Sequence, residues 1–248
     1  MNERKPILYV FTISHFCEKA RWALDFLSID YQLSVVAPGT HLQIANKLGL
    51  KRGSTPFLQT ANGVIQGSDA IIDWAESQST SLTLSDAQNQ QTISEIESRL
   101  DEKLGVHIRR WFYSEAIIEQ PNLVKPIFLR DISVWEKLKF SIKWPVIKKL
   151  MIKRMDLGRE QGSESFEIVK QELAWLDQLI KNSNFLNGEK LSRADITAAA
   201  LLAPAINPPN HPTSQYINLP PRVKEQTKEL AQTAVWPWVE EIYTNYRR

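Results

Sequence analysis

Residues 7–27 read ILYVFTISHFCEKARWALDFL, a short apolar run followed at once by a helical pattern. The apolar run at 7–11 is typical of a buried β-strand, and the spacing over 18–27 predicts an amphipathic helix. Ser14 and Cys17, a hydroxyl and the single thiol of the chain, lie three residues apart where the predicted strand passes into the helix. Exposed backbone amides at a helix start favour an anion, so a sulfur held there would ionise more easily.

The residues beyond this stretch continue an α/β pattern up to about residue 77. A second predicted strand at 31–36 follows the helix, and a strand–helix–strand connection implies a parallel pair with a right-handed crossover. Further along, the pattern predicts a short helix, two strands joined by a turn, and another helix, at 41–48, 56–59, 63–65 and 70–75. The last of these helices opens at Ser68-Asp69.

The rest of the chain shows no strand alternation. Residues 78–92 are rich in the polar side chains typical of a linker, and beyond residue 93 apolar residues recur every three or four positions. Ser192 and Asp195 are spaced as in a capping box, which predicts a helix start at that point. The predicted fold class is α/β plus all-α, with an α/β domain over 1–77, a linker over 78–92 and an all-helical domain over 93–248.

Composition and charge exclude several classes of protein. Of the 248 residues, 43% are hydrophobic and 23% charged, which excludes collagen-like, low-complexity and fully disordered chains. A formal net charge of +2 gives no electrostatic reason to expect a nucleic-acid partner. The longest apolar stretch, at 198–206, is far shorter than the roughly 18 residues of a membrane-spanning helix. A single cysteine excludes an intramolecular disulfide and favours a reducing compartment, so we expect a soluble, cytoplasmic protein.

Four motifs occur in order along the whole chain: SHFCEKAR at 14–21, STPF at 54–57, GSDAI at 67–71 and SRADI at 192–196. Together they resemble the cytosolic glutathione S-transferases. The resemblance implies an N-terminal thioredoxin-like domain that binds glutathione and an all-helical C-terminal domain that shapes a pocket for a hydrophobic electrophile. It also implies a cytoplasmic homodimer that acts in detoxification, with glutathione as co-substrate and no metal.

The resemblance places Ser14 at the position of the reactive serine or cysteine of these enzymes. Its hydroxyl would donate to the glutathione sulfur and stabilise the thiolate that attacks the electrophile. Local sequence by itself favours Ser14 as only a helix cap. Cys17 falls where related redox proteins carry a second cysteine, here without its partner. Packing at the base of the helix is our preferred interpretation of Cys17, and catalysis is the second.

Further positions match the glutathione-binding residues of the family. Thr55-Pro56 corresponds to a cis-proline step at which the preceding residue pairs through its backbone with the cysteinyl part of glutathione. Ser68 corresponds to the serine that holds the γ-glutamyl carboxylate, and a helix start is a physically suitable place for an anion. The chain departs from the family at Gly67, where an acid or amide is usual. We therefore expect Asp69 to hold the γ-glutamyl amine, although Ser68 and Asp69 could also be ordinary caps.

The glycine carboxylate of glutathione needs a cation or a good hydrogen-bond donor. His41, Lys51 and Arg52 lie in the segment that would face it. His41 is our first choice because it follows a turn at the start of a predicted helix, and Arg52 is also included among the binding residues. Solvated surface charge is the alternative for each of them.

The predicted helical domain offers two further features. Trp111 and Tyr113 lie on its first long helix, whose counterpart in the family lines the electrophile pocket, although aromatic residues at helical spacing also occur in protein cores. Residues 136–154 contain seven basic residues and one acid, interleaved with apolar side chains. Such a stretch can lie on a membrane surface, but snorkelling lysines on a packed helix give the same pattern. Pro145 is expected to interrupt it, and we favour the packed helix.

The leading hypothesis is therefore a glutathione transferase that conjugates the glutathione thiolate to a small hydrophobic electrophile. Three alternatives stay open. The first is a glutathione-dependent peroxidase or thiol reductase that works through Cys17, and the second is a non-catalytic binder of hydrophobic ligands with the same fold. The third is a module that docks on a membrane surface or a partner through the basic stretch.

Overall fold

The computed structural model describes residues 5–213, 216 and 218–247, and the chain divides into two compact units. The sheet unit comprises Met1–Leu82 and Lys125–Leu150, and the helical unit comprises Thr83–Val124 and Met151–Arg248. The domain boundaries predicted from the sequence, which follow the chain linearly through 78–92, stay a prediction. The two units are described separately below.

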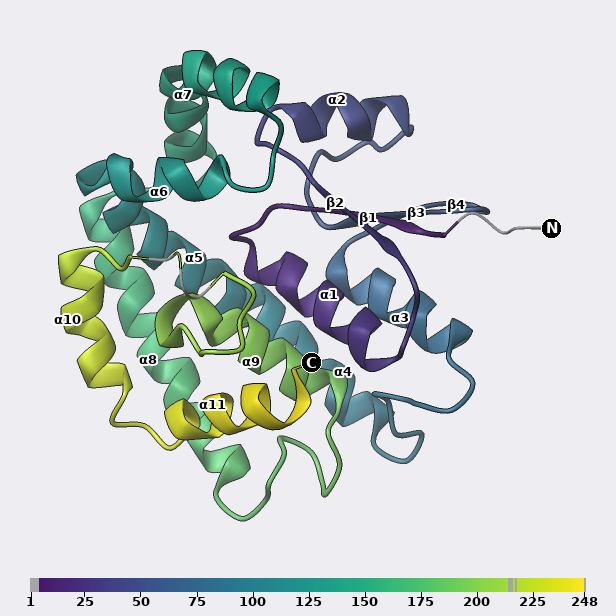
Figure 1. The fold of residues 1–248 in the computed structure, drawn as a ribbon. Helices are drawn as coiled ribbons and strands as arrows, with labels where there is room; N and C mark the ends of the chain where they lie inside the picture. The colour runs from purple at the N-terminus through teal and green to yellow at the C-terminus, as the bar shows by residue number, and fades with distance from the viewer. Residues whose placement is uncertain (1–4, 214–215, 217, 248) are drawn as a thin grey trace. The chain divides into compact units, whose positions relative to one another are not determined.

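A four-stranded mixed sheet forms the centre of the sheet unit (Figure 1). Its order is β2-β1-β3-β4, with the bounds Gln32–Val35, Ile7–Val10, Phe57–Thr60 and Gly63–Gln66. The pair β1 and β2 is parallel, as the sequence predicted, and the other two pairs are antiparallel. Apolar side chains of the two central strands are fully buried: Leu8, Val10, Phe57 and Leu58.

Three helices cover this sheet. Helices α1 (His15–Phe26) and α3 (Ser68–Gln78) pack against each other on one face, and α2 (Thr40–Lys47) lies on the other (Figure 1). The apolar side of α1 explains its place, since Trp22, Ala23 and Leu24 are fully buried. A sheet of this kind flanked by helices is the predicted thioredoxin-like fold.

The segment after α6 (Pro121–Phe128) adds a long helix, α7 (Val134–Met155). At its N-terminus the Ser133 hydroxyl donates to Glu136 Oε2 over 3.0 Å, and the Glu136 N–H donates back to Ser133 Oγ over 3.3 Å. The expected interruption at Pro145 is wrong, because α7 is continuous through it. Pro145 cannot donate to the carbonyl of Ser141, but it lies on the exposed side of the helix, where water can satisfy that carbonyl.

The helical unit packs around α9, whose residues are almost all buried. Its capping box is present as predicted: the Ser192 N–H donates to Asp195 Oδ2 over 2.7 Å. The Leu186 N–H donates to the other carboxylate oxygen of Asp195, also over 2.7 Å. The elements of this unit are α4 (Gln90–Arg99), η1 (Leu100–Gly105), α5 (Val106–Tyr113), η2 (Ser114–Glu119), α8 (Arg159–Ile180), α9 (Arg193–Ile206), α10 (Pro221–Leu230) and α11 (Val235–Tyr246). In the part of the chain that is described, no helix combines the length and the apolar character needed to cross a membrane.

Candidate functional site

Ser14 is the N-cap of α1. Its backbone is extended, with φ −81° and ψ 118°, and its Oγ accepts a hydrogen bond from the Cys17 N–H over 3.4 Å. The side chain is only half-buried. A hydroxyl that accepts from a backbone amide keeps its own proton to donate. The cap therefore leaves that proton for a second partner, which is the Cys17 sulfur in this structure and would be the ligand sulfur once the hydroxyl rotates toward it.

Cys17 lies in the first turn of α1 and is 1% exposed. Burial raises the pKa of its thiol. Hydrogen bonds from the side chains of Ser14 and Thr55 and with the Phe11 backbone oppose that rise in pKa, as does the charge of Arg21. A buried thiol with a raised pKa is a poor nucleophile, so these surroundings favour the packing interpretation of Cys17 over catalysis.

The loop before β3 meets the start of α1 at this point. The Thr55–Pro56 peptide bond is cis, as the family resemblance implied. The Thr55 side chain interacts with the sulfur of Cys17, and the Pro56 carbonyl accepts a hydrogen bond from the Gly67 N–H over 3.1 Å. Through these contacts the fold brings together three segments that are far apart in the sequence.

Gly67 and Ser68 begin α3. Gly67 is its N-cap with φ +105° and ψ 145°, a conformation that favours glycine, and Ser68 is buried as the first helical residue. Asp69 is exposed, and its Oδ1 lies 2.7 Å from the place that a Cβ on Gly67 would occupy. A carboxylate thus lies beside Gly67, and the role of Asp69 toward a γ-glutamyl amine stays a prediction.

Gln66 has a supporting role that sequence reasoning missed. Its Nε2 donates to the backbone carbonyls of Arg52 and Ser54, both over 2.8 Å. These bonds tie the loop before Thr55 to the end of β4. Nothing in the local pattern signals this role, because the acceptors lie 14 and 12 residues earlier in the chain.

His41 lies in the first turn of α2. Its Nδ1 accepts from the Gly39 N–H over 2.9 Å, so the neutral ring carries its proton on Nε2. The ring packs edge-to-face on Phe11, with centroids 4.7 Å apart, which places it next to the strand end that leads to Ser14. Arg52 is exposed, and its backbone carbonyl accepts the hydrogen bond from Gln66 described above.

Trp111 and Tyr113 lie on α5 in the helical unit and are buried there, with 1% and 7% exposed. The Trp111 Nε1–H donates to Gln226 Oε1 over 2.8 Å, and its ring lies 5.4 Å from that of Phe166. Packing within the helical unit accounts for both side chains, and their role as a pocket wall stays a prediction.

The arrangement in the sheet unit suits a ligand with a sulfur and a carboxylate. The half-buried Ser14 hydroxyl lies at the N-terminus of α1, and the buried Ser68 is the first residue of α3. Both helix ends carry the partial positive charge of a helix N-terminus, which favours anions. A thiolate at the first and a carboxylate at the second would each be stabilised by the same physics.

Comparison with known proteins adds the family context. Residues 8–81 match the family model described as glutathione S-transferase, N-terminal domain. No curated protein sequence matches significantly. Similar solved structures include glutathione transferase GSTFuA2 from Phanerochaete chrysosporium (13% identity, TM-score 0.69, 99% of each chain covered). They also include the beta-etherase LigF from Sphingobium sp. strain SYK-6 (20%, 0.59, 96% of this chain and 99% of that one) and a glutathione S-transferase from Rhodospirillum rubrum F11 (19%, 0.55, 98% and 95%). The chain therefore has the glutathione S-transferase fold over its length.

Proposed function

We propose that this chain, which carries a glutathione S-transferase N-terminal domain in a glutathione S-transferase fold, is a glutathione transferase that uses Ser14 to stabilise the thiolate of glutathione. The electrophile is a small hydrophobic molecule, the enzyme is a homodimer, and its location is the cytoplasm. The observation that carries the proposal is the position of the Ser14 hydroxyl at the start of α1, beside the cis-proline loop.

The energetics of thiolate stabilisation are within reach of this position. A thiol with an ordinary pKa of about 8.5 is only a few per cent ionised at neutral pH, and lowering that pKa by two units takes about 2.7 kcal/mol. A hydrogen bond to a charged group contributes about 1.5–3 kcal/mol, and the α1 N-terminus adds to it. Ser14 and the helix end together account for the required stabilisation.

Residues of the sheet unit can bind each polar group of glutathione. The backbone of Thr55 pairs with the cysteinyl part, and Ser68 at the start of α3 holds the γ-glutamyl carboxylate. Asp69 holds the γ-glutamyl amine, while His41 and Arg52 face the glycine carboxylate. Each assignment pairs a group with one of opposite charge or with a hydrogen-bond donor.

The proposed chemistry uses the two substrates and the Ser14 hydroxyl. Ser14 donates a hydrogen bond to the glutathione sulfur, which holds a negative charge once its proton has passed to solvent. The thiolate attacks an electrophilic carbon and forms a carbon–sulfur bond with its electron pair. That carbon either releases a leaving group as an anion or passes the electron pair to an adjoining acceptor, which is then protonated.

Substitution of Ser14 tests the proposal. We expect Ser14→Ala to lower kcat/KM with glutathione and a chlorodinitrobenzene by about 10- to 100-fold, as loss of a hydrogen bond to a charged group implies. The apparent pKa of the bound thiol in the pH–rate profile should rise at the same time. The matched control is Ser77→Ala, which removes an exposed hydroxyl at the far end of α3.

Three results would contradict the proposal. Unchanged turnover in Ser14→Ala removes Ser14 from the mechanism. Activity that survives in Ser14→Ala but is lost in Cys17→Ala supports the peroxidase or reductase alternative instead. Glutathione binding measured by calorimetry without any turnover, across a panel of electrophiles, favours the non-catalytic binder.

A further inference from the structure

Helix α7 presents apolar side chains on two opposite faces. Phe140, Trp144 and Ile147 form its inner face: Phe140 and Trp144 pack on Phe128 with ring centroids 6.0 and 6.2 Å away, and Ile147 lies next to Gly39. The outer face is apolar as well. An exposed apolar face of this size is normally covered, by protein or by lipid.

The outer face holds most of the large apolar side chains that the sheet unit exposes. Val134, Trp135, Ile142 and Val146 are 80, 72, 71 and 72% exposed, and Leu138 is 51% exposed. Successive residues of an α-helix turn by about 100°, so these five fall within an arc of about 120°. We call these five residues the outer arc. Beyond Val146, the next residue within this range of angles is Lys149, so the apolar strip ends there.

Positive charge borders the outer arc on both sides. By helical position, Lys139 and Lys143 lie beyond one edge of the arc, and Lys137 and Lys148 lie beyond the other. The one acid of residues 136–154, Glu136, is engaged with Ser133 in the cap at the helix N-terminus. An apolar strip between two rows of lysine is the pattern of a helix that lies in the plane of an anionic lipid surface.

We propose that the outer arc of α7 docks on an anionic membrane surface. The apolar side chains insert between the lipid headgroups, Trp135 lies at the interface that tryptophan favours, and the lysines meet the lipid phosphates. A second copy of this chain is a poorer occupant. Two such faces would bring their lysine rows together, and the basic stretch offers only Glu136 against seven basic residues. This inference does not depend on the proposed transferase activity.

Co-sedimentation of the full chain with lipid vesicles tests the proposal. The probes are phosphatidylcholine vesicles with and without a quarter of phosphatidylglycerol, at low and at raised salt. We expect binding to the anionic vesicles at low salt, at least tenfold weaker binding to pure phosphatidylcholine, and release by salt because the lysine contribution is screened. Binding that ignores lipid charge, or no binding at low salt, overturns the proposal.

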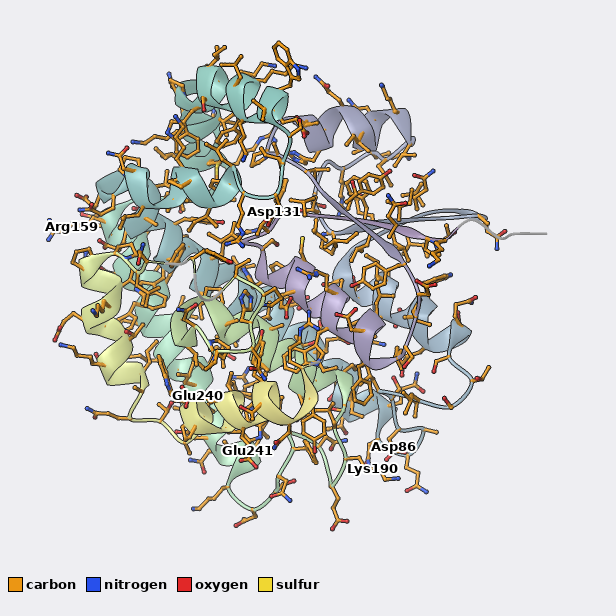
Figure 2. The ribbon with its side chains drawn as sticks, in the orientation of Figure 1. Asp86, Asp131, Arg159, Lys190, Glu240 and Glu241 are labelled. Carbon is orange, nitrogen blue, oxygen red and sulfur yellow. The ribbon has the colours of Figure 1, made fainter. Side chains whose placement is uncertain are left out.

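Variants locate the contact. Lys139→Gln/Lys143→Gln should weaken binding by about five-fold per lysine. The control Lys190→Gln/Lys224→Gln makes the same change in net charge on the helical unit, where Lys190 extends into solvent (Figure 2). An equal loss in both variants attributes binding to net charge and overturns the proposal.

The apolar contribution has its own pair of variants. Ile142→Ser/Val146→Ser should weaken binding by about tenfold or more, whereas Leu82→Ser, at a side chain that is 42% exposed elsewhere in the sheet unit, should not. Circular dichroism confirms that each variant is folded, and all of these side chains are exposed. Equal binding by Ile142→Ser/Val146→Ser and wild type overturns the proposal. Sedimentation without lipid gives a further test. If wild type is a dimer and Ile142→Glu is a monomer, the outer arc is a protein interface and the proposal is overturned.

Discussion

Ser14 and Cys17 occupy the same helical turn, yet their surroundings give them different chemistry. The Ser14 hydroxyl is half-exposed and can donate a hydrogen bond outward, whereas Cys17 is 1% exposed and its thiol has a raised pKa. The thiolate is the nucleophilic form of a cysteine, and burial disfavours it. The residue-level environment therefore supports a reaction in which the attacking sulfur belongs to glutathione.

The raised pKa of Cys17 has a measurable effect on stability. Above the unfolded-state value of about 8.5, the unfolded chain releases the thiol proton while the folded chain keeps it. The unfolded state then binds fewer protons at this group, so the contribution of this thiol to the free energy of unfolding falls with pH, by at most about 1.4 kcal/mol per unit, until the folded-state pKa is reached. We expect Cys17→Ala to lose less stability than wild type between pH 8 and 10 in urea unfolding. Parallel losses in both proteins would contradict the raised pKa.

At the scale of elements, the bonds of Gln66 link β4 to the loop before the cis-proline. Removal of its side chain leaves the Arg52 and Ser54 carbonyls without that donor and loosens the loop. We expect Gln66→Ala to raise the KM for glutathione several-fold with little change in kcat, and to speed amide hydrogen exchange over residues 51–55.

The control for Gln66 is Gln78→Ala, an exposed glutamine at the end of α3. Hydrogen exchange in the loop does not require an active enzyme, so the structural role is tested separately from catalysis. Unchanged exchange in Gln66→Ala would show that other contacts hold the loop.

Sequence patterns predicted the elements well where the signal is local. The parallel pair of β1 and β2, the helix start at Ser192 and the helix opening at Ser68 all depend on residues close together in the chain. The bonds of Gln66 join positions 12 and 14 residues apart, which periodicity does not report. The expectation for Pro145 failed because a proline usually breaks a helix, whereas here α7 continues through it with Pro145 exposed.

At the scale of the whole molecule, the compact units do not follow the chain linearly. Residues 125–150 group with the N-terminal sheet although they stand between segments of the helical unit. The amino-acid composition does not change at residues 125 and 150, so the sequence alone predicted a single boundary near residue 78. The outer arc of α7 consequently belongs to the same unit as the candidate glutathione site.

The homodimer implied by the family resemblance is a prediction at this same scale. We expect sedimentation equilibrium without lipid to give twice the monomer mass for wild type and for Ile142→Glu alike, because the outer arc is assigned to lipid. A monomer at micromolar concentration would contradict the homodimer.

The burial of the chain's one cysteine also makes the protein a ready host for site-directed probes. A thiol introduced on the outer arc of α7, for example at Val146, would be the only accessible sulfhydryl and would take a nitroxide label selectively. Paramagnetic quenching by oxygen and by a water-soluble nickel complex would then report how deeply that position enters a bilayer, with no native residue needing removal first.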